Sequence, residues 1–443
     1  MNAAFPALPL EITDLIIDSI GQNVVQRDAR VALQACSLVC RSFRKRSQHY
    51  LFSKIVFRKT RFDTVSQISA RITALRAILY NCIILPPTVP ASGRIIHHIK
   101  DVEISLSCTV EEAYTILRHI DVAKVLFEFC KDKERGLRRL FLNMQGCEPP
   151  VDWERFDPLF IKSLSMTLVS PFFTTLCLSN IRNVPSFVLG RTKISNISFH
   201  MISTRIVDPR DVRCEYHLGS IEVMDIDPSF AISLFLKADD PERTSFRECL
   251  SRVRELRFSA PAVPGFVQMI NPLRGTFKSL QILKLVLADA SRHPRGGLTA
   301  NVPYADLPLL RSLGITMKGA ISTTKFAPLK DLKIVLYPKT ASKSLATIRL
   351  DLFIESQYPW KDIHQFFPNE KLWKELDQVL NHKSFDSLRT VYLDLEYHLG
   401  GKHLYLFNET TFLHRCHGYL SDIFPSLALS SLISIVPSAR FTV

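Results

Sequence analysis

Five potential metal ligands lie close together near the C-terminal end of the sequence. They are four histidines and one cysteine: His398, His403, His414, Cys416 and His417. Imidazole nitrogens and thiolates commonly bind structural zinc, usually as two pairs whose members are about two to four residues apart. The group His414-x-Cys416-His417 is too tight for tetrahedral coordination of that kind. We therefore expect no metal site, and the chain is predicted to need no cofactor.

Motifs that perform chemistry in enzymes are missing from the sequence. It contains no G-x-S-x-G elbow, no G-x-x-x-x-G-K-[ST] phosphate loop, no G-x-G-x-x-G fingerprint and no H-E-x-x-H zinc motif. With 15 glycines in the whole chain, few tight phosphate-binding loops can form. Gly400-Gly401-Lys402 lacks the spacing of such a loop and is interpreted as a turn. We expect a binding protein, not an enzyme.

Length and composition indicate a globular chain with more than one core. The 443 residues are 47% hydrophobic and 22% charged, which gives ample apolar surface to offset the entropy lost on folding. No apolar run reaches the roughly 18 residues of a membrane-spanning helix, so we expect no membrane partner. Glu11, Asp14 and Asp18 interrupt the region where a signal peptide would be apolar. We expect a cytoplasmic or nuclear protein.

The charge of the chain is strongly positive and unevenly distributed. The formal net charge is +14, and residues 41–61 contain eight Lys or Arg and no Asp or Glu. Such a run favours an acidic partner, which could be a protein, a membrane surface or a nucleic acid. The run lacks the glycine and aromatic pattern of RNA-recognition motifs and the spacing of zinc fingers. We therefore expect no nucleic-acid partner, although a basic nucleic-acid-binding protein is kept as an alternative.

The N-terminal segment is predicted to form three short helices. Pro9 suits a first helical turn, apolar residues then recur at helical spacing, and Gly21 ends the helix. Asp28 is predicted to cap a second helix, ARVALQACSLVC, and RSFRKRSQHYLF forms the third. The second helix is apolar around most of its circumference, and two neighbouring helices cannot cover it fully. Another surface must bury the remainder.

These same residues resemble a known family. Leu8-Pro9-x-Glu11-Ile12, Leu33, the run Cys36-Ser37-Leu38-Val39-Cys40-Arg41-Ser42-Phe43, and Leu51-Phe52 together resemble an F-box over residues 5–57. The resemblance implies docking onto an acidic Skp-type adaptor, which connects the chain to a cullin scaffold. The residues that it places at the adaptor are Leu8, Pro9, Ile12, Ile16, Leu33, Cys36, Val39, Cys40 and Phe43. The alternative is an ordinary helical subdomain packed on the same chain.

After a proline-rich loop at residues 85–94, a short strand pattern recurs. It has the form apolar-x-x-apolar-x-apolar, and its occurrences begin at Ile99, Leu137, Ile161, Phe173, Ile194, Leu218, Val253, Leu280, Leu310, Leu329, Leu345 and Leu388. In a chain this apolar the pattern alone proves nothing, because about one position in ten matches by chance. Many occurrences, however, are followed by a polar loop and a new apolar segment. This rhythm resembles irregular leucine-rich repeats.

The repeat spacing leaves two architectures open. Third anchors are separated by 24 residues from Leu142 to Met166 and by 35 from Val223 to Phe258, whereas leucine-rich repeats span roughly 20–29. An ordinary α/β domain with short parallel strands is the alternative. We predict an α+β chain: a three-helix F-box at 1–57, a connecting segment at 58–98, a leucine-rich-repeat-like α/β solenoid at 99–400 that recognises the substrate, and a C-terminal segment at 401–443.

The predicted function is that of a substrate receptor in a Skp-cullin-F-box ubiquitin ligase. The N-terminal helices bind the Skp-type adaptor and, through it, a cullin, while the repeat-like region binds an unknown protein client. No residue of this chain need react, because the receptor acts by holding its client near a conjugating enzyme. An adaptor-binding scaffold outside a cullin complex is the first alternative, and an unrecognised hydrolase is the last.

Overall fold

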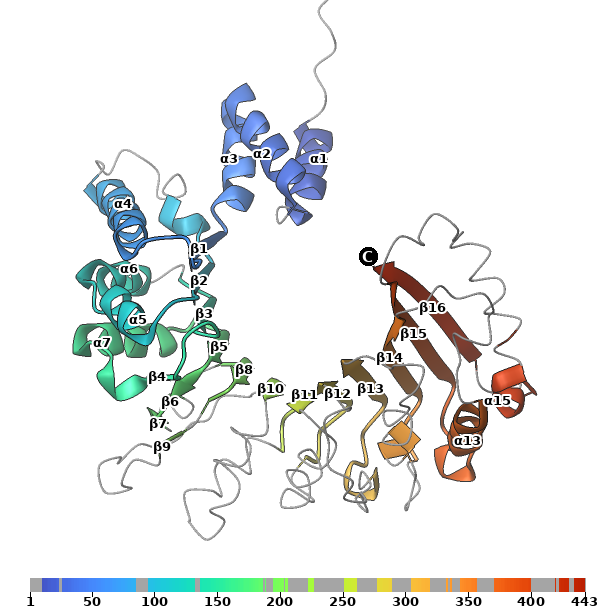
Figure 1. Ribbon diagram of the computed structural model, residues 1–443. Helices are drawn as coiled ribbons and strands as arrows, with labels where there is room; N and C mark the ends of the chain where they lie inside the picture. Colours follow the sequence, from blue (N-terminus) through green and yellow to red (C-terminus); the bar gives the residue numbers. More distant parts are fainter. Residues whose placement is uncertain are drawn as a thin grey trace, which may run out of the picture. The chain divides into compact units, whose positions relative to one another are not determined.

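The structure is a computed structural model of the whole chain (Figure 1). The residues it describes are 10–23, 26–84, 95–131, 136–185, 188, 194–202, 204–205, 222–226, 251–260, 277–288, 304–318, 332–333, 335–336, 343–356, 370–399, 419, 422–429 and 434–442. The chain divides into two compact units, Met1–Gly219 and Ser220–Val443. Among the described residues, no helix combines the length and apolarity needed to cross a bilayer.

The first unit begins with the predicted helices. They are α1 (Leu10–Gln22), α2 (Arg27–Val39) and α3 (Arg41–Leu51). Helix α1 buries Thr13, Ile17 and Gly21, one on each successive turn, so this stripe faces its neighbours. A side chain could not replace the hydrogen of Gly21, because a Cβ there would lie 2.4 Å from the Tyr50 ring. The predicted cap at Asp28 was wrong: Gln26 is the N-cap, and Asp28 lies in the first turn, where its charge favours the helix dipole.

A parallel sheet follows the helices directly. Its described strands in the first unit occur in sequence order: β1 (Lys54–Lys59), β2 (Asp101–Leu106), β3 (Arg139–Asn143), β5 (Thr175–Ser179) and β8 (Asn196–His200). Parallel neighbours need crossover connections. Here these include α4 (Val65–Ile84), α5 (Val110–Leu117), α6 (Ile120–Lys131) and α7 (Pro158–Leu168), which lie on one side of the strands in Figure 1.

The apolar anchors of the sequence pattern are aligned across this sheet. Val102 is in register with Leu140, Leu140 with Leu176, and Leu176 with Ile197. All four side chains are at most 2% exposed. Equivalent positions therefore form a continuous buried row, and each strand extends the apolar core begun by the strand before it.

Short elements complete the described part of the first unit. They are the 3-10 helices η2 (Ile95–His98) and η3 (Trp153–Arg155), and the strand pairs β4 (Val151–Asp152) with β6 (Ile181–Arg182) and β7 (Val184–Pro185) with β9 (Thr204–Arg205).

The second unit repeats the same parallel arrangement. Its described strands, again in sequence order, are β10 (Val223–Ile226), β11 (Glu255–Ala260), β12 (Ile282–Ala288), β13 (Ser312–Lys318), β14 (Thr347–Ser356), β15 (Thr390–Leu399) and β16 (Ser434–Thr442). The connections include η7 (Tyr304–Asp306), α13 (Glu370–Leu380), η9 (Lys383–Phe385) and α15 (Pro425–Leu429). A buried row runs through Leu256, Leu283, Leu313, Ile348 and Val391.

The chain is therefore a mixed helix and strand protein with large parallel sheets, as the α+β prediction stated. The strand predicted at Ile161, Leu164 and Met166 was wrong, because these residues lie in helix α7. Leu332, the described anchor of the strand predicted near Leu329, is helical as well. Asp157 caps helix α7 by accepting a hydrogen bond from the Leu159 amide, and Pro158 occupies its first turn. These local start signals outweigh the apolar spacing.

One described strand crosses a predicted domain boundary, and regular elements lie in the predicted connecting and C-terminal segments. Strand β1 spans the boundary at residue 57, and helix α4 lies in the segment predicted to be a connection. Strand β16 lies in the predicted C-terminal segment and pairs with β15. The proline-rich loop at 85–94 and the glycine turn at 400–402 fall outside the described residues, as does most of the strand predicted near Leu329.

Candidate functional site

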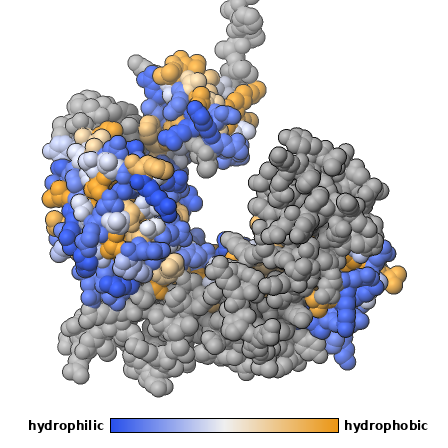
Figure 2. All heavy atoms as spheres, in the orientation of Figure 1, coloured by the Kyte–Doolittle hydropathy of each residue, from blue (hydrophilic) through white to orange (hydrophobic). Residues whose placement is uncertain are grey.

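Helices α1 to α3 leave large apolar side chains on their surface. On α1, Ile12, Leu15 and Ile16 are 44%, 68% and 49% exposed. Their spacing of three and four residues places them on one face, opposite the buried stripe. On α2, Val31 and Leu38 are two turns apart, and Leu38 and Val39 are 79% and 67% exposed. Figure 2 shows apolar residues gathered on this part of the molecule. We call these six residues the apolar helix surface.

The structure separates the predicted adaptor-binding residues into three groups. Ile12, Ile16, Val39 and Cys40 are exposed. Cys36 and Phe43 are partly buried, and Leu33 is fully buried, where it contributes to the core of the helices. Leu8 and Pro9 lie outside the described residues.

Three residues of the apolar helix surface were not among the predicted adaptor contacts. They are Leu15, Val31 and Leu38. The sequence did contain a signal for them. Leu15 follows Ile12 by three residues and Leu38 follows Val31 by seven, and residues at these spacings lie on the same face of a helix.

An ion-pair cluster joins α1 to α3. Arg46 Nε donates to Asp18 Oδ1 at 2.7 Å, and the Tyr50 hydroxyl donates to the same oxygen at 3.0 Å. The hydrogen bond from Arg46 holds the pKa of the Asp18 carboxyl below its usual value, and that from Tyr50 lowers it further. Asp14 lies 3.9 Å from Arg46 on the outer side of the pair. The cluster fixes the orientation of α3, which carries much of the basic run.

The basic run at 41–61 is partly neutralised within the chain. Besides Arg46, Lys54 Nζ lies 2.7 Å from Glu103 and Lys59 Nζ lies 3.4 Å from Glu112. Arg58 is a further partner of Glu103, at 3.7 Å. Lys59 is 3% exposed, so this lysine belongs to the interior of the unit. The sequence could not show these pairs, because both glutamates come from β2 and α5, well beyond the run.

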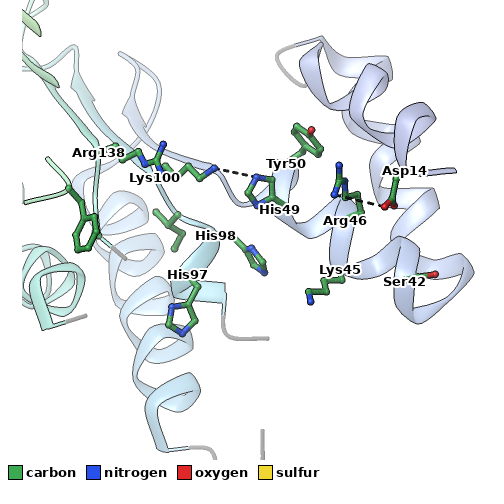
Figure 3. Close-up of a pocket in the computed structure, with 13 residues that line it drawn as sticks. Asp14, Ser42, Lys45, Arg46, His49, Tyr50, His97, His98, Lys100 and Arg138 are labelled. Atoms are coloured by element: carbon green, nitrogen blue, oxygen red, sulfur yellow. Dashed lines mark hydrogen bonds and ion pairs between the residues drawn. The ribbon is translucent and has the colours of Figure 1, made fainter. Parts of the chain in front are cut away.

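A cavity of about 790 Å³ lies where α3 meets the amino ends of the sheet strands (Figure 3). Its walls come from α3, from η2, and from the residues just before β2, β3 and β5. Among the described residues its lining is Asp14, Ser42, Lys45, Arg46, His49, Tyr50, His97, His98, Ile99, Lys100, Gly136, Arg138 and Phe172. We call it the basic pocket.

Backbone hydrogen bonds hold the strand ends that form this pocket in a row. The Lys100 amide donates to the Ser53 carbonyl at 2.9 Å, and the Arg138 amide donates to the Lys100 carbonyl at 2.7 Å. Lys100 and Arg138 therefore occupy equivalent places on neighbouring strands. Lys100 Nζ also lies 3.3 Å from His49 Nε2, which links the sheet edge to α3. The His49 ring packs edge-on against His98, with centroids 5.8 Å apart.

Most of the histidine and cysteine group near the C-terminal end, for which no metal site was expected, lies outside the described residues. His403, His414, Cys416 and His417 lie outside them, and His398 lies in β15. Within the described ranges, no three His, Cys, Asp or Glu side chains are placed to hold a metal ion.

Comparison with known proteins gives no relative from which a function could be transferred. The sequence matches no protein-family model and no curated protein.

Proposed function

We propose that this chain is a substrate-receptor subunit of a Skp-cullin-F-box ubiquitin ligase. In this proposal the apolar helix surface binds a Skp-type adaptor, and the sheet region binds a protein client destined for ubiquitin transfer. The chain itself performs no reaction and acts by proximity.

The observation that carries the proposal is the exposure of the apolar helix surface. Large apolar side chains gathered on the surface of a small segment are typical of an interaction site. Ile12, Ile16 and Val39, which the F-box resemblance assigns to the adaptor, are all in this group. Complete burial of one such side chain stabilises a complex by roughly 1.5–3 kcal/mol. Leu33 would support docking indirectly, by holding α2 in place.

The basic run supports a modest electrostatic contribution to this docking. Lys45 is exposed on α3, whereas Arg46, Lys54, Arg58 and Lys59 already contact carboxylates of the same chain. Exposed charges mainly accelerate encounter with an acidic partner. The internal pairing also reduces the cationic surface that a nucleic acid would need, so the protein-binding proposal is favoured.

The sheet of the second unit offers a surface for the client. In one row of registered positions, Arg257, Lys284 and Arg349 are exposed, and the row continues to Tyr392 and Val436, which are 39% and 41% exposed. This row alternates with the buried anchors, so it occupies the opposite face of the sheet. A face that combines fixed charges with an aromatic side chain suits protein recognition.

The proposal is tested by measuring adaptor affinity with matched charge substitutions. The double variant Leu15→Asp/Leu38→Asp places carboxylates within the apolar helix surface. The control Phe62→Asp/Leu429→Asp changes two equally exposed apolar residues elsewhere, at 96% and 87% exposure. Full-length proteins are titrated against a purified Skp-type adaptor. We expect the first variant to bind at least about 100-fold more weakly and the control to bind as wild type.

Two other results would count against parts of the proposal. Equal adaptor affinity for all three proteins, or no affinity in any, would reject adaptor docking through this surface. Tight adaptor binding without recovery of a cullin from cell extracts would instead favour the scaffold alternative. Loss of client turnover with retained client binding in the Leu15→Asp/Leu38→Asp variant is the result expected of a receptor.

A further inference from the structure

We propose that the basic pocket binds a small molecule that carries two or more phosphate groups. The proposal does not depend on the ubiquitin-ligase function, because it rests on the lining of the basic pocket and not on the apolar helix surface. Among the described residues that line the pocket, four are lysine or arginine and three are histidine, whereas Asp14 is the one carboxylate.

The cationic side chains reach the cavity from separate elements. Lys45 and Arg46 come from α3, Lys100 precedes β2, and Arg138 precedes β3. Figure 3 shows these side chains around a shared space. A ligand there would be contacted from several sides, which is how phosphate groups are usually held by lysine and arginine.

Two described carboxylates near the cavity, Asp14 and Asp18, contact the same arginine. Asp14 lies 3.9 Å from Arg46, and Asp18 accepts two hydrogen bonds from the same guanidinium. Both carboxylates are therefore engaged with Arg46. Lys45, Lys100 and Arg138 are the other lysine and arginine side chains of the described lining.

The size of the cavity favours a polyphosphate ligand over a single small ion. A volume of about 790 Å³ lies in the range of sites for small organic ligands, roughly 300–1,000 Å³, and exceeds what one phosphate ion fills. Tyr50 and Phe172 add aromatic surface beside the charges. The lining thus suits a molecule with an organic body and several phosphates.

The placement of the lysine and arginine residues explains why the pocket is preorganised. Lys100 and Arg138 are joined by a backbone hydrogen bond, so their side chains start from neighbouring strand ends at a fixed separation. Arg46 is oriented by its ion pair with Asp18. Little conformational entropy need be lost when an anion binds between such fixed groups.

The test uses inorganic triphosphate as the probe and calorimetric titration of the full chain. The double variant Lys45→Ala/Arg138→Ala removes two exposed cations from the pocket, and Arg61→Ala/Arg254→Ala removes two exposed cations that do not line it. We expect the pocket variant to bind triphosphate at least about 30-fold more weakly, and the control within about twofold of wild type. Lys45→Arg should retain binding because it preserves the charge.

Three results would overturn the proposal. They are no binding of triphosphate by wild type at millimolar concentration, equal weakening in both double variants, and a preference for a phosphoserine peptide over triphosphate. The second would indicate general attraction to a positive chain, and the third a different ligand. Unchanged circular dichroism in the pocket variant would show that it folds.

Discussion

Arg46 of α3 holds Asp18 of α1 through two parallel hydrogen bonds, from Nε to Oδ1 at 2.7 Å and from Nη2 to Oδ2 at 2.5 Å. Two parallel hydrogen bonds between a guanidinium and a carboxylate fix the relative orientation of the two side chains as well as their separation. The same guanidinium lines the basic pocket, so one side chain orients the helices and contributes to the cavity. The contribution of this ion pair to stability, and that of buried contacts elsewhere in the chain, can be measured by substitution.

Asp18→Asn should loosen the N-terminal helices at neutral pH. The pair is partly exposed, so we expect a loss of about 1 kcal/mol, which corresponds to roughly fivefold faster hydrogen exchange in α1 and α3. Because Arg46 and Tyr50 lower the folded-state pKa of Asp18, its stabilisation is complete above the ordinary value of 3.8 and is lost as the pH falls through the folded pKa. The difference between variant and wild type should therefore shrink as the pH falls below 3.8. The control Asp14→Asn also removes one negative charge, but one that lies farther from Arg46, so it should change hydrogen exchange less. An equal change in exchange for both variants would contradict a specific role for Asp18.

Asp121→Ala should destabilise the first unit strongly. Its carboxylate is 4% exposed and accepts hydrogen bonds from Thr73 and Arg76 of α4, both at 2.7 Å. Burial alone would raise the pKa of Asp121, but these two hydrogen bonds lower it below its usual value. Removing the carboxylate leaves Arg76 without this partner, and we expect a loss of about 2–3 kcal/mol in urea unfolding followed by circular dichroism.

The matched control for Asp121 is Glu111→Ala. Glu111 pairs with Arg155 at 2.9 Å but has a 72% exposed side chain. Surface pairs of this kind contribute little, so the change should stay within about 0.5 kcal/mol. A smaller loss for Asp121→Ala than for Glu111→Ala would show that the contact between α4 and α6 does not stabilise the unit.

Gly146→Ala and Gly314→Ala should have opposite effects on thermal unfolding. A Cβ on Gly146 would lie 2.5 Å from the Ser107 Cα, so the backbone after β2 or after β3 would have to move, at a cost of about 1–3 kcal/mol. A Cβ on Gly314 would meet its nearest neighbour, Lys284 Cγ, at 3.4 Å, which is ordinary contact. Alanine there should raise stability by a few tenths of a kcal/mol or more, because it restricts the unfolded chain. A lower melting temperature for Gly314→Ala than for Gly146→Ala would contradict this packing.

Asp377→Ala should release helix α15 from α13. The Asp377 carboxylate is 1% exposed and accepts hydrogen bonds from the amides of Ser426 at 2.9 Å and Leu427 at 3.0 Å, at the start of α15. Its removal leaves two amides without this acceptor, and we expect a loss of about 2 kcal/mol. Limited proteolysis should then cut near residues 422–429 at least about tenfold faster. Lys374→Ala, which breaks an exposed pair with Glu370, should leave the cleavage rate unchanged.

Much of the fold could be predicted because its signals are local. The apolar residues of α1 recur at helical spacing, and anchors such as Leu137, Leu140 and Leu142 mark where β3 forms. The same spacing failed at Ile161 to Met166, where the capping residues Asp157 and Pro158 decide for helix. Local periodicity thus has to be read together with the residues that start an element.

The candidate sites were predicted unevenly. The apolar helix surface follows from residues a few positions apart; Ile12, Ile16 and Val39 were among the predicted residues, whereas Leu15, Val31 and Leu38 were not. The basic pocket was missed because His49, Lys100, Arg138 and Phe172 come from four distant segments. Parallel pairing in the order β1, β2, β3 brings those segments together, and pairing partners depend on contacts that a single sequence does not display.

The strand order also bears on how the chain can be made. In the main sheet of each unit, every described strand after the first pairs with the strand before it in the sheet order, and that strand also lies earlier in the sequence. During synthesis, each strand that leaves the ribosome therefore finds its partner already formed. After the first strand, each described strand of these main sheets can pair with a strand already made, so ordered structure can grow stepwise from the N-terminal end. Such growth limits the time during which apolar strands stay exposed to other unfinished chains.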